Sequence, residues 1–483
     1  MVEVIRHTKT DYGDKQEKEM KNIKYIHIIV LALMLSGLFS TCKIGHRYQS
    51  PALEGMPLAF DEFSALSDTS AADLGWSTLY EDAVLQNLID RALENNKDIL
   101  MATARIKQMI AQKRISFVGM LPEVGINASG NREYENYGGH DGSYSNEFSA
   151  NLSVAWELDL WGNLRWKNEA GVAAYLQSVE SRQALKLSII AQVAQTYFEL
   201  IALDRELEIV RKTLDSRKES VRFAKLRYEG GLTSEIPYRQ SIVELSRAET
   251  LIPDLENQIK LKENDLDILI GDYPSFVIPR GKGIWELAPP DSLPVNLPSV
   301  LLRNRPDVRM AEQRLIEYNA QVGAALTDFF PKIRLTGRLG GESDEISNFL
   351  KSPAWLISGA LTGPVFNFGR NKAQYDASKA AYEEQMYDYE KTVLNVFKEV
   401  NNAISSFYKT KDMRRSQEEL YSSTQSYLNL ARLQYVNGIV NYLDLLDAQR
   451  QLFDAEIALN DARLRELTAA VTLYKVLGGG VVR

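Results

Sequence analysis

The sequence predicts an α+β membrane protein built from two copies of one unit, in which two amphipathic strands are followed by very long helices. Three observations support this fold class. Similar segments recur at a nearly constant spacing along the chain, polar and apolar residues alternate over lengths that suit a membrane, and two very long stretches contain neither glycine nor proline. Self-similarity at a fixed spacing is the mark of a duplicated unit.

The internal repeat is visible in matched segments of the two halves. Leu121-Pro122 resembles Phe330-Pro331 at an offset of 209 residues, and Leu226-Arg227-Tyr228 resembles Leu433-Gln434-Tyr435 at an offset of 207. The sequence therefore predicts two structural repeats, at 76–273 and 298–480, joined at 274–297 by a linker rich in proline and glycine.

The strands are predicted by alternation. From Phe148 to Leu160, apolar residues occupy every second position and polar residues most of the positions between them. A strand needs about 9–11 residues to cross a membrane, so this length is sufficient. A soluble hairpin with one buried face would show the same alternation. We expect strands at about 123–135 and 147–161 in the first repeat, and at about 332–341 and 355–367 in the second.

Four strands cannot close a membrane barrel on their own, because an open edge in lipid leaves backbone groups without partners. The smallest usual barrels have about eight strands. Several chains must therefore share one barrel, and three chains would supply twelve strands. The sequence demands assembly, but the number three does not follow from it.

The helices are predicted by the long stretches without breakers. Residues 172–229 and 370–437 contain no glycine or proline, and a second helix is expected after Gly231 and Gly438. These lengths favour helical hairpins over a globular core. A first helix is expected at about 82–118. A long soluble coiled coil would give similar helical patterns, and the strands and the N-terminal segment argue against it.

The N-terminus reads as a lipoprotein signal. Residues 1–41 are predicted to be a signal peptide, in which Lys21 and Lys24 precede an apolar run that ends just before Cys42; its true start is expected at Met20. We expect Cys42 to carry the lipid, palmitate included, with 42–75 as an extended, lipid-anchored segment. The alternative is a buried or incidental cysteine.

The composition excludes several other classes. A single cysteine and four histidines leave little for a metal site or a nucleophile, and no phosphate-binding loop or catalytic triad signature occurs. The net charge of −8 argues against a nucleic-acid partner. We therefore expect no enzyme activity, no cofactor and no bound metal.

Several motifs resemble the TolC-like outer-membrane efflux protein family, most closely its OprM/CusC/NodT-type lipoprotein channels. The resemblance covers nearly the whole mature chain and is carried by six segments, Gly45–Pro51, Trp76–Arg105, Trp156–Gly162, Leu302–Arg309, Gly363–Arg370 and Tyr435–Arg450.

The resemblance implies a fold and a function. The fold would be a trimeric twelve-stranded barrel, continued by a long α-helical tunnel through the periplasm. The chain would be the outer-membrane channel subunit of a tripartite efflux system, a homotrimer in contact with outer-membrane lipid. It would passively export substrates received from an inner-membrane pump of the resistance-nodulation-division (RND) type through a periplasmic adaptor protein. Two alternatives stay open, a TolC-like exit duct of a type I secretion system and a periplasmic coiled-coil structural or adaptor protein.

The resemblance also implies site residues at the tips of the helical hairpins. Tyr228, Gly231, Gly438 and Tyr442 would face the adaptor. Asp444 and Asp447, three residues apart and hence on one helical face, would line the entrance gate together with Tyr435. The arginine that a TolC-type latch has at this tip is replaced by Val440. The alternative is a solvated helical face, or a helix-capping role for Asp447.

Overall fold

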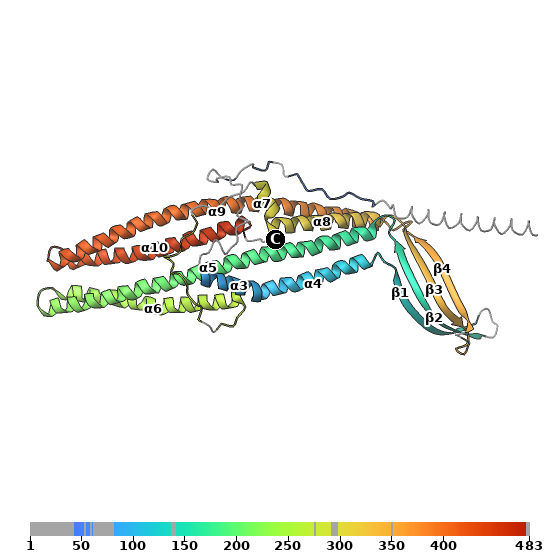
Figure 1. Cartoon of the computed structure of the whole chain (residues 1–483), viewed down its shortest axis with the longest axis horizontal. Coiled ribbons are helices and arrows are strands. Elements are labelled where there is room, and N and C mark those ends of the chain that lie inside the picture. The colour runs from blue at the N-terminus through green and yellow to red at the C-terminus, as the bar shows by residue number, and fades with distance from the viewer. Residues whose placement is uncertain are drawn as a thin grey trace, which may run out of the picture. The chain divides into compact units, whose positions relative to one another are not determined.

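A computed structural model of the chain (Figure 1) describes residues 43–52, 55–57, 60, 82–136, 142–274, 277–290, 298–348 and 351–479. The expected signal peptide and Cys42 lie outside these residues. The chain divides into two compact units. The first contains the described residues of 1–50, 109–175 and 314–385, and the second contains those of 51–108, 176–313 and 386–483.

The first unit contains one four-stranded antiparallel sheet. Its strands are β1 (Glu123–Glu135), β2 (Ser143–Leu158), β3 (Lys332–Ser343) and β4 (Pro353–Thr362), in the order β1-β2-β3-β4 (Figure 1). In the register, Asn127 lies opposite Asn151, and Leu152 lies opposite Leu339. The hairpins of the two repeats therefore join edge to edge into a single sheet.

Two strands end earlier than the sequence suggested. β2 ends at Leu158, not at 161, because Asp159 already caps the following helix. β4 runs from Pro353 to Thr362, not from 355 to 367, and the next residues are Gly363 and Pro364. Proline has no backbone N–H to donate to a ladder, so the strand cannot continue through it.

The sheet has two chemically different faces. Residues that are opposite in the register share a face, and successive residues of a strand alternate between faces. One face carries Ile126, Trp355 and Ile357, residues that are 82%, 74% and 79% exposed in the single chain. The other face carries polar residues such as Asn127 and Asn151. The apolar face needs a lipid or protein cover.

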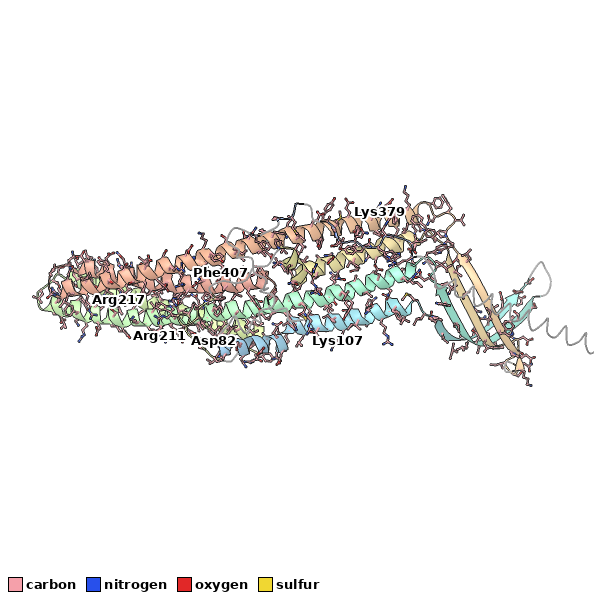
Figure 2. The ribbon with its side chains drawn as sticks, turned by 45° about the horizontal axis from the view of Figure 1, so that its top comes forward. Asp82, Lys107, Arg211, Arg217, Lys379 and Phe407 are labelled. Atoms are coloured by element: carbon pink, nitrogen blue, oxygen red, sulfur yellow. The ribbon has the colours of Figure 1, made fainter. Side chains whose placement is uncertain are left out.

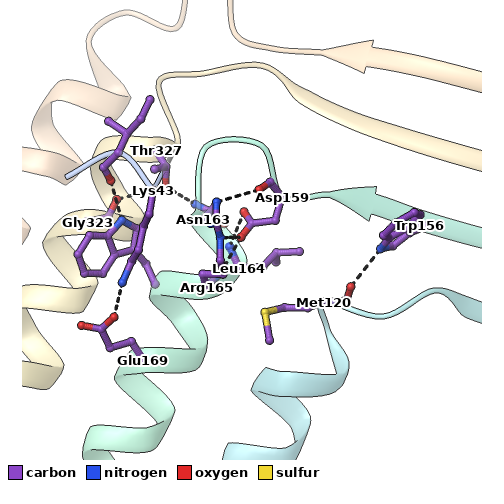
Figure 3. Close-up of polar contacts among 12 residues, drawn as sticks. Lys43, Met120, Trp156, Asp159, Asn163, Leu164, Arg165, Glu169, Gly323 and Thr327 are labelled. Atoms are coloured by element: carbon purple, nitrogen blue, oxygen red, sulfur yellow. Dashed lines mark hydrogen bonds and ion pairs between the residues drawn. The ribbon is translucent and has the colours of Figure 1, made fainter. Parts of the chain in front are cut away.

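The turn from sheet to helix is fixed by side-chain hydrogen bonds (Figure 3). The Asp159 carboxylate accepts the backbone N–H groups of Leu164 and Arg165, each at 3.0 Å, at the start of α5 (Asn163–Glu229). The Trp156 indole donates to the carbonyl of Met120 at 3.0 Å, which ties β2 to the chain entering β1.

The described N-terminal segment is docked on this junction. The Lys43 ammonium lies 3.2 Å from the centre of the Trp166 ring and pairs with Glu169 (Figure 3). The buried Trp166 indole donates to the Ile44 carbonyl at 2.7 Å, and the Ile44 N–H donates to the carbonyl of Trp161 at 3.1 Å. The residue that follows Cys42 is thereby held against the start of α5.

The helices fall into two similar sets. The first repeat has α3 (Ala83–Asn95), α4 (Lys97–Val118), α5 and α6 (Glu235–Ile270). The second has α7 (Pro298–Asn304), α8 (Pro306–Thr327), α9 (Arg370–Val436) and α10 (Tyr442–Val476). In the second unit α5 runs beside α6 and α9 beside α10 (Figure 1). In the described part of the chain, no helix is apolar over a length that would span a membrane.

The single helix expected at 82–118 is wrong, because Asn96 breaks it into α3 and α4. The Asn96 side chain accepts from Asp98 N–H at 3.0 Å and donates to the Leu269 carbonyl at 2.9 Å. In the second repeat Arg305 stands between α7 and α8 and donates to the Val476 carbonyl at 2.9 Å. The two donors, Asn96 and Arg305, are 209 residues apart, and the two acceptors, Leu269 and Val476, are 207 residues apart. The repeat seen in the sequence therefore extends to its internal hydrogen bonds.

The core of the second unit includes the linker. Its buried cluster contains Leu88, Val193 and Leu266 together with Ile278 and Ile284 of the linker. Asp82, at the N-terminus of α3 (Figure 2), accepts from the Tyr197 hydroxyl at 3.1 Å and from the Lys282 N–H at 2.9 Å. The described part of the linker is therefore a packed element of the core.

Candidate functional site

Both helical hairpins of the second unit turn through a left-handed glycine. Gly231 has φ 70° and Gly438 has φ 74°. The N–H of Leu232 donates to the Arg227 carbonyl, and that of Ile439 donates to the Gln434 carbonyl, both at 2.9 Å. This is the hydrogen-bond pattern of a helix that ends in a glycine cap, and it favours glycine because a side chain is strained at positive φ.

The second tip begins its returning helix with a capping box. Asn441 accepts from the N–H groups of Leu443 at 2.7 Å and Asp444 at 3.2 Å, and Asp444 accepts the N–H of Asn441 at 3.1 Å. In the first tip, Ser234 makes no such side-chain bond. The exposed carboxylate of Asp444 is therefore fixed on the first turn of α10, and the capping role that was the alternative for Asp447 belongs to Asp444.

Asp447 lies one turn further along the same exposed face. It accepts from Gln451 Nε2 at 2.7 Å and from the Tyr427 hydroxyl of α9 at 3.5 Å. Burial, and then the charges of Asp447 and Asp444, raise the pKa of the Tyr427 hydroxyl. The charges of both carboxylates thus affect the same residue of α9, Tyr427, as expected for two residues on one helical face.

Tyr435 lies away from these carboxylates, in the interior of the tip. Tyr435 and Tyr442 are each 7% exposed, and their ring centres are 6.1 Å apart. Phe223 of α5 meets Tyr435 edge-on at 6.3 Å, and the Arg227 guanidinium lies 5.3 Å from the Tyr435 ring. The three residues grouped by the sequence therefore separate into two exposed acids and one buried aromatic ring.

A polar cluster that sequence reasoning missed joins the two hairpins. Glu244 of α6 pairs with Arg450 of α10 and, at 3.1 Å, with Arg247. Arg217 of α5 (Figure 2) donates to Gln449 of α10 at 2.5 Å. Glu244 and Arg217 are both buried. The partners across the hairpins are more than 200 residues apart in sequence, and charged residues on long helices read as solvated, so no local signal could have found them.

The electrostatics of this cluster favour ionised groups. Burial alone would raise the pKa of Glu244, but the hydrogen bond from Arg450 and the charges of Arg450, Arg217 and Arg247 lower it below its ordinary value. Burial lowers the pKa of Arg217, and the charge of Glu244 opposes that shift. The buried carboxylate is therefore held as an anion between arginines from three helices.

Two grooves flank the cluster. One, of about 450 Å³, lies between α6 and α10 and is lined by residues that include Ile236, Val243 and Leu446. The other, of about 470 Å³, lies between α5 and α9 and is lined by residues that include Phe223, Leu428 and Val436. Among the residues that the structure describes, no group of three or more His, Cys, Asp or Glu side chains could hold a metal ion.

Comparison with known proteins identifies this arrangement. The family model described as outer membrane efflux protein matches the chain twice, at residues 88–272 and 297–479. The cation efflux system protein CusC of Escherichia coli O157:H7 is 30% identical over 459 residues, which cover 93% of this chain and 97% of CusC. The probable efflux pump outer membrane protein TtgC of Pseudomonas putida KT2440 is 32% identical over 471 residues, 94% and 95% of the two chains.

Solved structures agree with these relatives. The MtrE outer membrane channel of Neisseria gonorrhoeae, in its open state, superposes with a TM-score of 0.85 at 31% identity, covering 91% of this chain and 99% of that one. The outer-membrane channel OprN gives the same TM-score at 26% identity, with the same coverage of 91% and 99%. The chain therefore belongs to the outer membrane efflux protein family and is an outer-membrane channel subunit of an efflux system.

Proposed function

We propose that three copies of the chain form one channel, in which each four-stranded sheet supplies a third of a closed twelve-stranded barrel. In a single chain, β1 and β4 are the edges of the sheet. Edges in lipid must be paired, so β1 of one copy would pair with β4 of the next. The apolar face, with Ile126 and Trp355, would contact the outer-membrane lipid, and the polar face would line water.

Asp444 and Asp447 form the proposed entrance gate. Both are exposed on one face of α10 next to the tip, and three copies would bring six carboxylates around one axis. Rings of carboxylates favour cations and oppose anions at a constriction. Tyr435 would support the gate indirectly. Its buried ring packs against Phe223 and so fixes the position of α9 against α5.

The hairpin tips form the proposed docking surface for a periplasmic adaptor, which would link the channel to an inner-membrane pump of the RND type. The tips carry apolar side chains in water: Leu232 and Ile439 are each 71% exposed, and Tyr228 is 39% exposed. Gly231 and Gly438 shape the two turns, while the buried Tyr442 would support the second tip from inside. The two grooves beside the tips could accept the apolar side chains of such a partner.

Cys42 is the proposed site of the lipid anchor. Its neighbour Lys43 is held by Trp166 and Glu169 at the junction of β2 and α5, which is the helical end of the proposed membrane sheet. An acyl chain on the preceding residue would then reach lipid directly. Relatives at 30–32% identity are named for the efflux of cations, antibiotics and toluene, so the proposal covers efflux in general and assigns no single substrate.

Single-channel recording in planar bilayers tests the gate. Asp444→Ala with Asp447→Ala should raise the conductance, whereas Asp461→Ala, an exposed aspartate further along α10, should not. Because Asp444 also caps the helix, the pair Asp444→Asn and Asp447→Asn separates charge from capping: it should open the channel equally. Unchanged conductance in both double variants would show that Asp444 and Asp447 do not form the entrance gate. Wild-type protein that never conducts would contradict the proposed channel.

A further inference from the structure

The polar face of the sheet carries its charges in an ordered way. By register, the half of this face from which α5 and α9 continue contains Lys332 and Arg334 near the strand end and Arg338 in the middle of β3. Glu123 and Glu157 lie in the same half, so the basic residues outnumber the acids there by one. At the opposite end, next to the hairpin loops, it carries only acidic charges among the described strand residues, namely Glu133, Glu135, Glu147 and Glu342. The face therefore changes sign along the strands, which the alternation of polar and apolar residues alone does not require.

Two of the three basic residues are unpaired within the described chain. Lys332 has carboxylate partners, Asp328 at 3.5 Å and Glu157 at 4.0 Å. Arg334 and Arg338 are exposed, and no described carboxylate lies within ion-pair distance of either. Arginine keeps its charge at any physiological pH. These two guanidinium groups therefore present a fixed positive charge to whatever fills the space in front of the sheet.

Arg338 is isolated by the register itself. Its direct neighbours on the adjacent strands are Ser153 and Leu356. Glu123 and Glu157 also lie on the polar face, but Glu157 is opposite Arg334. Glu123 is on β1, two strands away from Arg338, which corresponds to about 10 Å. Since neither residue directly opposite Arg338 is acidic, no change of their rotamers can give Arg338 a carboxylate partner.

We infer that Arg338, supported by Arg334, is the anion-selecting residue of the barrel interior, and that it acts in series with the acidic gate at the hairpin tips. This rests on the proposed trimer, in which the polar face lines the water-filled interior and each arginine occurs three times around the axis. A ring of fixed positive charge enriches anions and depletes cations at its own level of the pore. Exported molecules that carry a carboxylate or sulfonate would be favoured there.

The test is the reversal potential of single channels in a potassium chloride gradient. The parent carries Asp444→Asn and Asp447→Asn, so that the tip acids do not dominate the selectivity. Adding Arg338→Gln should raise the ratio of potassium to chloride permeability by about twofold or more, because ring charges act over a screening length of about 10 Å at 0.1 M salt. Arg338→Lys should keep the parent ratio.

Arg132→Gln is the matched control. Arg132 is an exposed arginine of the same sheet, but it lies on the apolar face, 4.8 Å from the Tyr144 ring. It should leave the permeability ratio unchanged. An unchanged ratio in Arg338→Gln, in a channel that conducts, would overturn the inference and leave the proposed channel intact. A parent that never conducts would refute the channel itself, and the inference with it.

A labelling experiment covers the case in which Arg338→Gln does not assemble. The single native cysteine, Cys42, is the proposed lipid attachment site and would have no free thiol, so Arg338→Cys and Leu339→Cys would each introduce one new reactive thiol. Cys at 338 should react with a charged, membrane-impermeant methanethiosulfonate reagent, and a cationic reagent should restore the parent ratio. Cys at 339, on the apolar face, should not react. Reaction at 339 but not at 338 would overturn the inference.

Discussion

The carboxylate of Glu244 on α6 is paired with the guanidinium of Arg450 on α10, so one ion pair joins the two helical hairpins beside their tips. The two residues are 206 positions apart in sequence. The Glu244 side chain is 8% exposed and that of Arg450 is 47% exposed. The pair therefore has one partner inside the bundle and one at its surface.

Replacing Glu244 by Gln should lower the free energy of unfolding by about 1–2 kcal/mol, less than for a fully buried pair because Arg450 is half in water. Thermal denaturation in detergent, followed by circular dichroism, measures this. The control is Glu235→Gln, which breaks the exposed pair with Arg239 at 2.7 Å and should cost about 0.5 kcal/mol or less. Equal losses in the two variants would show that burial of Glu244 contributes nothing.

The same pair makes stability depend on pH in one direction. The pKa of Glu244 is lowered in the folded chain, so its contribution is fully present above the ordinary value of 4.5 and is lost as the pH falls through the folded pKa. The difference in melting temperature between wild type and Glu244→Gln should therefore shrink between pH 7 and pH 3. A difference that stays constant or grows on acidification would contradict the lowered pKa.

Asn96→Ala should destabilise the chain by about 1–3 kcal/mol, because it removes the side-chain cap of α4 and leaves the Leu269 carbonyl without its donor. Chemical denaturation measures the change. Its neighbour Asn95 is exposed, and among the described residues its side chain bonds only to the Arg91 carbonyl of its own helix, so Asn95→Ala should be nearly neutral. Equal free energies of unfolding for the two variants would show that the hydrogen bond from Asn96 to the Leu269 carbonyl contributes little to stability.

Gly340→Ala should impair sheet formation, whereas Gly337→Ala should not. A Cβ at Gly340 would meet the Ala150 carbonyl oxygen at 2.1 Å, across the β2–β3 ladder, but one at Gly337 meets nothing within 4 Å. Forced overpacking typically costs about 1–3 kcal/mol, and here the clash is with backbone. Recovery of the proposed oligomer on detergent gels of unboiled protein, and its loss on boiling, reports assembly. Normal assembly of Gly340→Ala would mean that β2 and β3 are spaced differently.

Much of the fold could be predicted from the sequence, because it depends on local periodicity. The alternation from Phe148 to Leu160 located β2, and the lack of glycine and proline located α5 and α9. The break at Asn96 was missed because apolar residues continue with helical spacing on both sides of it. What breaks the helix is a contact with Leu269, which is 173 residues away.

The candidate site was predicted less completely. Asp444 and Asp447 do share one exposed face, since that follows from their spacing alone. The burial of Tyr435 depends on Phe223 and Arg227, which belong to the other repeat. The pairing of Glu244 with Arg450 likewise depends on how two distant hairpins pack. Sequence periodicity describes which side of a helix is apolar, but not which helix lies against it.

The buried linker has a consequence for the history of the chain. A duplicated gene can in principle be split again into two half-length proteins, and a loose tether would allow it. Here Ile278 and Ile284 fill the core, and the backbone of Lys282 binds Asp82 at the start of the first repeat. If the chain were divided between the repeats, whichever half lacked the linker would lose these contacts. The packed linker therefore makes the two repeats parts of one core, which neither half could complete alone.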